Sequence, residues 1–548
     1  MEFYDNFNDR WQEIRNDSFY DNFFEEIKKR FDEFRKEPII FFTYKDYMEF
    51  FENGNRSKND DYLIATKARL KNAFLLSLYS DEKVYIDEVC DMIWFFAGLP
   101  TWCGNAHIAN DWNADFSDYR GHIDLYAAEI GYLFAEIYYF LNKKLPQEIK
   151  YVIEKELESR IFTPFESRSY WWEPKTNNWS AVCGGSVGMS YMLVCPERFG
   201  KIKPRILSCM DAFVSSYTDD GCCTEGMGYW NYGFGYYTYF ADMLYRFTDG
   251  KEDIRYGDKI IKMAMFATHG YLDENIGLSF ADCGRVRGSG NSGLLCYLTE
   301  NYEGFSVPQI EMSIDSDLRK LMWTKKELCG KANEVPKGMY YYDKSGWYIN
   351  RKEEYSFGAK AGHNGEEHNH NDIGSFIFAD KETQILIDIG SMIYDRNNFN
   401  EHRYEYLHNS SLGHSVPIID GKGQKEGREY RGTVCEVEEN KFSLEIQKAY
   451  EGNLPKIIRS FELCDSGITL TDTFNDFDGH KATERFVSFI KPEVRDGAVK
   501  IGNCRLITEN IPEILEVQLI NHQNNLQNYY FLDYTVSGEK FSLKVEVA

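Results

Sequence analysis

The sequence predicts a chain of two parts, a helical part followed by a part built from antiparallel strands. Up to about residue 330 the apolar residues recur at helical spacing, and loops rich in Gly, Asn and Trp separate the helical runs. After Pro336 the period changes to two, with Gly, Asp and Asn turns between the runs. Many helices without intervening strands indicate stacked hairpins in a toroid or solenoid, and many antiparallel strands indicate a sandwich.

The helical part opens with an apolar stripe in the stretch SFYDNFFEEIKKRFDEFRK. The residues of the stripe are Phe19, Phe23, Ile27, Phe31 and Phe34. Further helices are predicted at roughly 122–142, 146–162, 179–195, 203–217, 233–247 and 256–269. No sequence repeat of fixed period links them.

Strands are predicted in six later segments. They are YSFGAKAG, GSFIFAD, TQILIDIG, TVCEVEENKFSLEIQKAY, KIIRSFELCDSGITLTDTF and KFSLKVEVA. The change of period places the domain boundary near residue 335. We therefore expect a helical domain at 1–335 and an antiparallel β-sandwich at 336–548.

Charge and composition limit the kind of ligand. The net charge is −25, from 62 Lys and Arg against 87 Asp and Glu, which argues against a nucleic-acid partner. An anionic ligand would need a local cluster of arginines, because solvent screens distant charge. Aromatic residues make up 16% of the chain, which suits ring-lined grooves for sugars but is explained equally well by an aromatic-rich core.

The N-terminal stretch MEFYDNFNDRWQEIRNDSF shows no basic segment followed by an apolar run, so no secretory signal is visible. No apolar run approaches the length of a membrane span. The 13 cysteines are read as reduced thiols in a cytoplasmic protein, although a chain that had lost its signal peptide would look the same. The oligomeric state stays open, and a homodimer is compatible with the sequence.

The stretch GEEHNHNDIGSF concentrates polar chemistry at the start of a predicted strand. In an extended chain, His368 and His370 point to the same side. Asp388 ends another predicted strand in LIDIG, and His414 follows in SLGHSVPIIDG. Imidazoles and a carboxylate at strand ends are candidate zinc ligands. The spacing is not that of a compact zinc finger, so a polar turn with backbone-bonded histidines is the alternative.

Two clusters in the helical part also carry polar side chains. WWEPKTNNWSAVCGGSVGMSY places Asn177 and Asn178 before a helix, and DDGCCTEGMGYWNYGFGYY contains Glu225, Tyr229 and Trp230. Asn178 could simply be a helix N-cap, and Tyr229 a core tyrosine. No strand precedes either glycine-rich stretch, so neither indicates a phosphate loop. No G-x-S-x-G or H-E-x-x-H motif supports a serine hydrolase or a zinc protease.

Taken in order, the motifs resemble those of the heparinase II/III-like polysaccharide lyases, a superfamily that includes heparin, heparan sulfate and oligoalginate lyases. The resemblance covers about residues 170–420. It is carried by NNWSAVCGGS, DDGCCTEGMGYWNYGFGYY, FADCG, HNHNDIGSF, LIDIGS and HNSSLGHSVPIIDG. It implies an incomplete α/α toroid followed by an antiparallel β-sandwich, with the active site in the cleft between them. It does not specify the substrate.

The resemblance also implies roles for individual residues. Tyr229 would be the catalytic base or acid, and Asn178 and His368 would neutralise a uronate carboxylate. The sequence departs from the family where Trp179 replaces the His or Arg that often follows the asparagine, which leaves a second base for anti elimination in doubt. Since the pKa of a phenol is near 10, a nearby cation would have to lower the pKa of Tyr229.

The remaining implied sites are a metal centre and a substrate-binding set. His370, Asp388 and His414 would hold one structural Zn²⁺. Candidate residues for binding an anionic oligosaccharide or polysaccharide are Asn177, Trp179, Glu225, Trp230, Arg285 and Arg403. Of these, the arginines could bind an acidic sugar through paired hydrogen bonds.

Two other functions remain open. A glycoside hydrolase on a toroid would need two carboxylates, for which Glu225 with Asp220 or Asp282 are candidates. A non-catalytic glycan-binding relative would explain Trp179, but the retention of Tyr229 with its partners argues against it.

Overall fold

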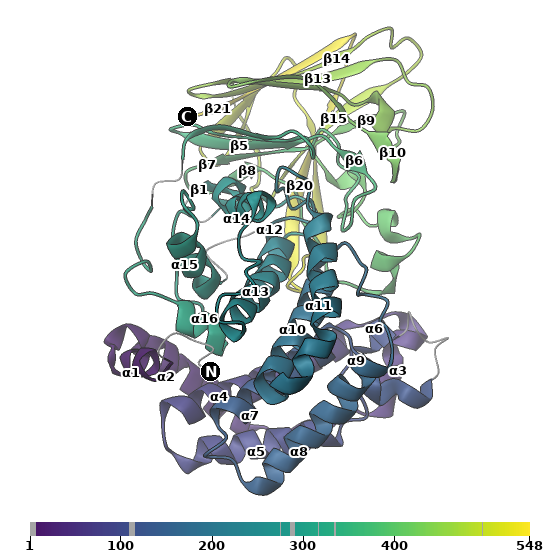
Figure 1. Cartoon of the computed structure of the whole chain (residues 1–548). Coiled ribbons are helices and arrows are strands. Elements are labelled where there is room, and N and C mark those ends of the chain that lie inside the picture. Colours follow the sequence, from purple (N-terminus) through teal and green to yellow (C-terminus); the bar gives the residue numbers. More distant parts are fainter. Residues whose placement is uncertain are drawn as a thin grey trace.

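A computed structural model describes residues 7–108, 116–273, 276–284, 291–315, 317–333, 336–495 and 497–548. It confirms the predicted order of a helical part followed by antiparallel sheets (Figure 1). The last described α-helix ends at Trp323, and the first strand of the sandwich begins at Gly338. Residues 334 and 335, where the domain boundary is predicted, lie outside the described part.

The helical part forms an incomplete α/α toroid, as predicted. The helices α4, α7, α10 and α13 pack side by side, and α5, α8 and α11 pack behind the first three of them. The helices are α1 (Phe7–Asn16), α2 (Asp21–Lys36), α3 (Tyr44–Asn53), α4 (Ser57–Tyr79), α5 (Lys83–Gly98), α6 (Asn105–Ile108), α7 (Leu125–Phe140), α8 (Gln147–Leu157), α9 (Thr163–Ser167), α10 (Asn178–Val194), α11 (Pro196–Ser216), α12 (Met227–Tyr229), α13 (Gly235–Phe247), α14 (Asp258–Gly270), α15 (Ser292–Asn301) and α16 (Leu318–Trp323). None of the described helices is long and apolar enough to span a membrane.

Two differences from the predicted helices have physical causes. The helix α11 begins at Pro196 rather than near residue 203, because proline is tolerated in the first turn, where its missing N–H is not needed. The helix α5 escaped prediction because apolar residues also occupy its exposed face, where Trp94 is 66% exposed, and they obscure the buried stripe in the sequence.

The strands form a sandwich with two small accessory sheets. The strands are β1 (Tyr271–Asp273), β2 (Ile276–Gly277), β3 (Gly338–Tyr342), β4 (Trp347–Arg351), β5 (Tyr355–Lys360), β6 (His363–Asn364), β7 (Phe376–Asp380), β8 (Gln384–Leu386), β9 (Pro417–Ile419), β10 (Gly427–Arg431), β11 (Thr433–Glu438), β12 (Lys441–Glu445), β13 (Ile457–Cys464), β14 (Gly467–Phe474), β15 (Ala482–Ser488), β16 (Glu493–Arg495), β17 (Ala498–Ile501), β18 (Cys504–Ile507), β19 (Glu513–Ile520), β20 (Leu526–Thr535) and β21 (Lys540–Val547). Every pairing between these strands is antiparallel.

One layer of the sandwich is an eight-stranded sheet of order β11-β12-β13-β14-β21-β18-β17-β16. The five-stranded sheet β3-β4-β5-β7-β8 and the four-stranded sheet β19-β20-β15-β9 face it. Buried aromatic rings join the layers, with centroids 5.0 Å apart for Phe357 and Phe461 and 6.0 Å apart for Phe486 and Phe541. The strands of the two faces therefore share one apolar core.

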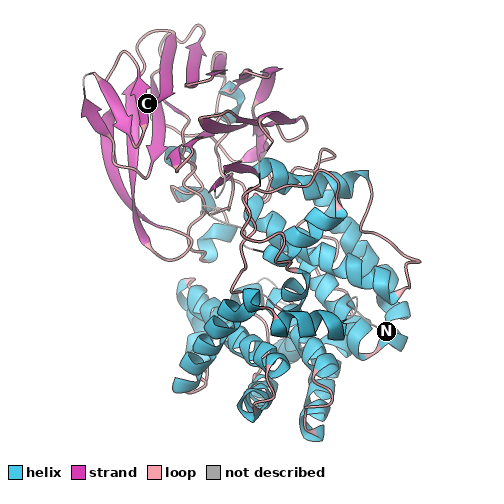
Figure 2. Cartoon of the chain, turned by 90° about the vertical axis from the view of Figure 1, so that its left-hand side faces the viewer, coloured by secondary structure: helices cyan, strands magenta, loops and turns pink. Residues whose placement is uncertain are grey.

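The five-stranded sheet also packs against the helical part, and this contact positions the site (Figure 2). Trp347 of β4 lies against Phe266 of α14, with ring centroids 5.9 Å apart. The buried Arg351 side chain donates to the backbone oxygens of Tyr271 and Thr268 at 2.7 Å each. The junction is thus both apolar and hydrogen-bonded, so the loops on either side of it have defined relative positions.

Candidate functional site

Asp282 connects the helical part to the histidine-rich loop. Its Oδ2 lies 2.8 Å from Nδ1 of His368, and its Oδ1 lies 3.0 Å from Nε2 of His370. Arg403 donates to the same carboxylate at 2.9 Å. These three partners hold the pKa of Asp282 well below its usual range despite its complete burial. Asp282 is therefore a fixed anion around which two histidines and an arginine are arranged.

The backbone at His368 differs from the extended chain assumed from the sequence. His368 has φ 55°, a left-handed conformation that is uncommon for a residue with a side chain. The extended backbone on which the sequence-based expectation rested is therefore not present at His368. The turn instead lets them reach opposite oxygens of Asp282, so His368 remains half-buried beside Tyr229 while His370 is buried.

Tyr229 lies at the end of the short helix α12, in contact with side chains from two other segments. Its ring is stacked on the imidazole of His368, with centroids 4.0 Å apart and an interplanar angle of 25°. Its hydroxyl lies 3.0 Å from the hydroxyl of Tyr394. Tyr229 is half-buried rather than a core tyrosine, and two polar groups converge on it.

The charges around Tyr229 do not have the expected effect on its pKa. Burial first, and then the carboxylate of Asp282, raise the pKa of Tyr229, whereas the hydrogen bond from Tyr394 and the charge of Arg56 lower it by less. The expectation that the site lowers this pKa was therefore wrong for the protein alone. Tyr229 carries its proton at neutral pH.

Asn178 and Glu225 stand on the other side of His368. Asn178 Nδ2 donates to Glu225 Oε2 at 3.5 Å, and the same Oε2 lies 3.9 Å from Nε2 of His368. Burial raises the pKa of Glu225 to about 7. Asn178 is not the N-cap of α10: Asn177 is, because its side chain accepts the backbone N–H of Trp179 at 3.1 Å. The structure thus brings Asn178 into the site and gives Asn177 a capping role.

The other four predicted substrate-binding residues differ in where they lie. Trp230 belongs to the core: it is buried and its indole N–H donates to Met263 O at 2.7 Å, so it was wrongly predicted to bind substrate. Arg403 is in the site but buried against Asp282. Trp179 is half-buried between the rings of Trp171 and His107, at 4.7 Å from each. Arg285 lies outside the described residues.

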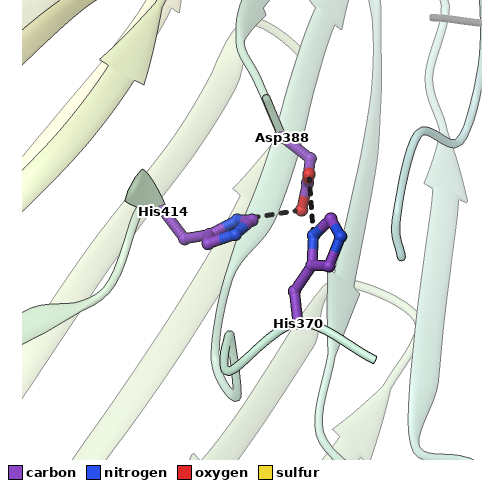
Figure 3. Close-up of side chains that lie close together, drawn as sticks. All are labelled: His370, Asp388 and His414. Carbon is purple, nitrogen blue, oxygen red and sulfur yellow. Dashed lines mark ion pairs between the residues drawn. The ribbon is translucent and has the colours of Figure 1, made fainter. Parts of the chain in front are cut away.

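His370, Asp388 and His414 form a buried cluster with metal-binding geometry (Figure 3). Each offers a ligand atom, and these atoms all lie within 4.8 Å of one another. Nδ1 of His414 lies 3.2 Å from Oδ2 of Asp388, and Nδ1 of His370 lies 3.9 Å from Oδ1 of the same carboxylate. Nδ1 of both histidines and Oδ2 of Asp388 are buried, and none has a hydrogen-bond partner outside this cluster in the described part of the chain.

The surroundings of this cluster fit a divalent ion. Nε2 of His370 is engaged by Asp282, and Nε2 of His414 faces the carbonyl oxygen of His408 at 2.9 Å. With the proton held on Nε2, each imidazole presents the lone pair of Nδ1, as metal-bound histidines do. Unpaired buried acceptors facing one another are costly unless a cation lies between them. The residues present therefore suit Zn²⁺.

A cavity of about 270 Å³ lies between the segment that follows Asp388 and residues 521–529. It is lined by Gly284, Ile389, Ser391, Asn521, His522, Gln523, Gln527 and Tyr529. The His522 ring lies 5.5 Å from the Tyr394 ring. A larger cavity of about 490 Å³ lies by the C-terminal ends of α13, α15 and α16, and its lining contains none of the predicted site residues. The smaller cavity is therefore the one related to the site, through the contact of its lining residue His522 with Tyr394.

The sequence did not indicate Tyr394 or the central role of Asp282. Asp282 was visible only as part of FADCG, where it was considered as a hydrolase carboxylate. Asp220, the other such candidate, accepts backbone N–H groups from Cys222 and Lys344 in a turn. Neither is a free catalytic acid. Backbone N–H groups engage the oxygens of Asp220, and two histidines and an arginine engage those of Asp282.

Comparison with known proteins supports the motif-based resemblance. Residues 334–531 match the family described as Heparinase II/III-like, C-terminal, which confirms the resemblance for that part of the chain. The comparison with curated proteins found no match.

Solved structures resemble nearly the whole chain. A crystal structure of heparinase III has a TM-score of 0.64 at 14% identity and covers 90% of this chain and 78% of its own. Chondroitin AC lyase of Streptomyces coelicolor A3, in complex with chondroitin sulphate, has a TM-score of 0.60 at 11% identity and covers 99% and 82%. Heparan sulfate lyase HepC of Pedobacter heparinus has a TM-score of 0.55 at 13% identity and covers 89% and 76%. At these identities the likeness establishes the fold.

Proposed function

Since residues 334–531 carry a heparinase II/III-like C-terminal domain, we propose that this chain is a polysaccharide or oligosaccharide lyase. Its substrates would be uronic-acid glycans, either glycosaminoglycans of the heparan sulfate or chondroitin type or alginate. The observation that carries the proposal is the stacking of Tyr229 on His368, whose Nδ1 is held by Asp282. The three residues come from separate segments, and their convergence supports the proposal because a phenol that could transfer a proton lies beside an imidazole that could hold a carboxylate.

The proposed reaction is a β-elimination. The proton on C5 of the uronate leaves, the C4–O bond breaks, and the electron pair forms a C4=C5 double bond. The leaving oxygen takes up a proton, and no water is consumed. Charge develops on the uronate carboxylate as C5 loses its proton, so hydrogen bonds to that carboxylate stabilise the transition state. Asn178 and His368 would supply them.

Tyr229 would transfer the proton. Because burial and Asp282 raise its pKa, its hydroxyl is protonated in the free protein and is suited to donate to the leaving oxygen. To accept the C5 proton it must first lose its own. The hydroxyl of Tyr394 at 3.0 Å can donate to the Tyr229 oxygen and stabilise the phenolate that is left once this proton has gone to solvent.

The metal cluster would have a structural role. A Zn²⁺ held by His370, Asp388 and His414 would link the loop of residues 368–372 to two other segments of the sandwich. His368 lies two positions before His370, so a fixed His370 also fixes His368. Tyr229 supplies the proton transfer, and no metal-bound hydroxide is required.

A glycoside hydrolase is the weaker alternative. It needs two carboxyl groups free to act on the sugar, one as acid and one as base or nucleophile. Glu225, with a pKa of about 7, suits the first role. Asp282 does not suit the second, because His368, His370 and Arg403 occupy its oxygens.

The direct test is incubation with a panel of uronate oligosaccharides, both sulfated and unsulfated. A lyase creates an alkene conjugated to the carboxylate, which absorbs in the ultraviolet. We expect this absorbance with at least one substrate. Its absence across the panel, for folded and metal-loaded protein, would contradict the proposal.

A further inference from the structure

Trp179 leaves the site without the cation that the family resemblance places after Asn178. Its indole packs between Trp171 and His107, and its position therefore holds a ring instead of a charge. An acidic sugar still needs a positive group beside the reacting atoms. Arg403, the described arginine of the predicted set, is buried against Asp282.

Arg56 comes from another part of the chain and contacts His107, whose ring centroid lies 4.7 Å from that of Trp179. It precedes the first residue of α4, and its guanidinium carbon lies 6.0 Å from the Tyr394 ring centroid and 5.5 Å from that of Phe399. The Tyr394 hydroxyl in turn contacts Tyr229. Phe399 is 53% exposed, so this side of Arg56 is near solvent. The Arg56 guanidinium, on a side chain that is 11% exposed, thus lies close both to the tyrosine pair and to an exposed ring.

The guanidinium is held in place by two partners. Nε donates to Oδ2 of Asp60 at 2.6 Å, and one terminal nitrogen lies 3.0 Å from Nε2 of His107. Nδ1 of His107 lies 2.7 Å from Asp124, which keeps the proton on Nδ1 and leaves Nε2 to accept from Arg56. Among the described residues, these contacts engage two of the five N–H groups of the guanidinium. A fixed cation with donors to spare is suited to bind an oxyanion.

We propose that Arg56 binds an anionic group of the substrate, a carboxylate or a sulfate, beside the Tyr229–Tyr394 pair. It supplies the positive charge that Trp179 does not. This role rests on the proposed function for its substrate class, uronate glycans. The positive charge of Arg56 also acts on Tyr229, where it opposes the effect of Asp282 on the pKa.

Arg56→Gln tests this role, with Arg69→Gln as the matched control. Both side chains project from or next to α4, are about one-tenth exposed, and have Nε 2.6 Å from a carboxylate oxygen. Arg69 pairs with Glu88 away from the tyrosines. We expect Arg56→Gln to raise KM by about 10- to 100-fold, as for loss of a charged hydrogen bond, with a much smaller change in kcat. Arg56→Lys should fall between the two, since it keeps the charge but not the planar fork.

The substrate panel separates the two anions. If Arg56 binds the uronate carboxylate, the rise in KM appears with unsulfated oligosaccharides as well. If it binds a sulfate, only sulfated substrates show it. Because Arg56→Gln leaves Asp60 without its cation, that variant alone could lose stability. The double variant Arg56→Gln/Asp60→Asn removes both charges and controls for this effect. The unfolding curves of all variants are compared.

Binding measured without turnover separates this proposal from the function itself. Calorimetric titration of the same oligosaccharides into Tyr229→Phe, with and without Arg56→Gln, needs no elimination. Binding that weakens with Arg56→Gln supports the role of Arg56 even if no alkene forms with the parent protein. The role is contradicted if folded Arg56→Gln binds every oligosaccharide as tightly as Arg69→Gln, or if none binds the parent.

Discussion

The hydroxyl oxygens of Tyr229 and Tyr394 lie 3.0 Å apart although 165 positions separate the two residues. Tyr229 comes from the helical part and Tyr394 from a loop of the sandwich. Their contact therefore exists only when both parts of the chain are folded and in contact. If Tyr229 transfers a proton as proposed, this contact makes the chemistry dependent on the relative position of the two parts.

Tyr229→Phe should reduce turnover by at least ~100-fold and leave substrate binding nearly unchanged, because only the ionisable hydroxyl is removed. Steady-state rates and equilibrium binding measure the two effects separately. Tyr151→Phe, on the exposed surface of α8, is the control and should behave as the parent protein. Turnover near the parent level in Tyr229→Phe would remove this tyrosine from the mechanism.

Asp282→Asn should lower the free energy of unfolding by about 3–5 kcal/mol, because Arg403 loses its buried carboxylate partner. It should also lower turnover, since His368 loses the group that orients it. Asp472→Asn breaks another buried pair, with Arg459, between β13 and β14 of the eight-stranded sheet, and should cost stability without loss of turnover per folded molecule. Chemical denaturation measures the stability of both variants, and steady-state rates per folded molecule measure their turnover. Equal turnover in the two variants would show that Asp282 serves stability alone.

Purified protein should contain about one equivalent of a divalent ion, bound by His370, Asp388 and His414. Asp388→Ala should lose the ion and, like a chelator, lower thermal stability, because the one anionic ligand is gone. His368→Ala should keep the ion while losing activity. Elemental analysis and thermal unfolding of the three proteins provide the test. Loss of the ion from His368→Ala would mean that the two histidines have the opposite roles.

Glu136 should make stability depend on pH. Burial raises its pKa from 4.5 to about 8, so the unfolded chain loses this proton first as the pH rises. The stabilisation is complete below about pH 4.5 and is lost as the pH approaches about 8. Glu136→Gln should remove this loss and be more stable than the parent above pH 8, by at most roughly 5 kcal/mol. Urea unfolding across this range measures it, with exposed Glu33→Gln as control; identical pH dependence in parent and Glu136→Gln would contradict the expectation.

Local patterns predicted the fold and much of the site. The change of period separated helices from strands. The polar residues at strand ends indicated His370, Asp388 and His414 as candidate metal ligands, and the structure brings these three side chains together. The sequence did not predict the role of a residue where that role depends on contacts with residues far away in the chain. The partners of Asp282 lie 86, 88 and 121 positions away, and no local pattern marks it as their meeting point. Trp230 was predicted to bind substrate because it lies next to Tyr229 in the sequence, but it is buried and its indole N–H donates to Met263 of α14.

The strands β15 to β20 also escaped prediction, for a related reason. The edge strand β19 alternates exposed and half-exposed residues, so no buried face gives it a clear period. The strands β16, β17 and β18 have three or four residues each, which is too short for a pattern to emerge. Pairing with neighbours, which a single segment does not reveal, defines them as strands.

The central claim is that the chain cleaves uronate glycans by elimination, and the fate of solvent oxygen tests it most directly. The reaction is run in water enriched in heavy oxygen on a substrate that the protein cleaves, and the products are weighed by mass spectrometry. Elimination predicts a product lighter by one water at its new non-reducing end, with no solvent oxygen gained in forming either end. Products that carry one heavy oxygen at the new reducing end and no double bond would show hydrolysis and contradict the account.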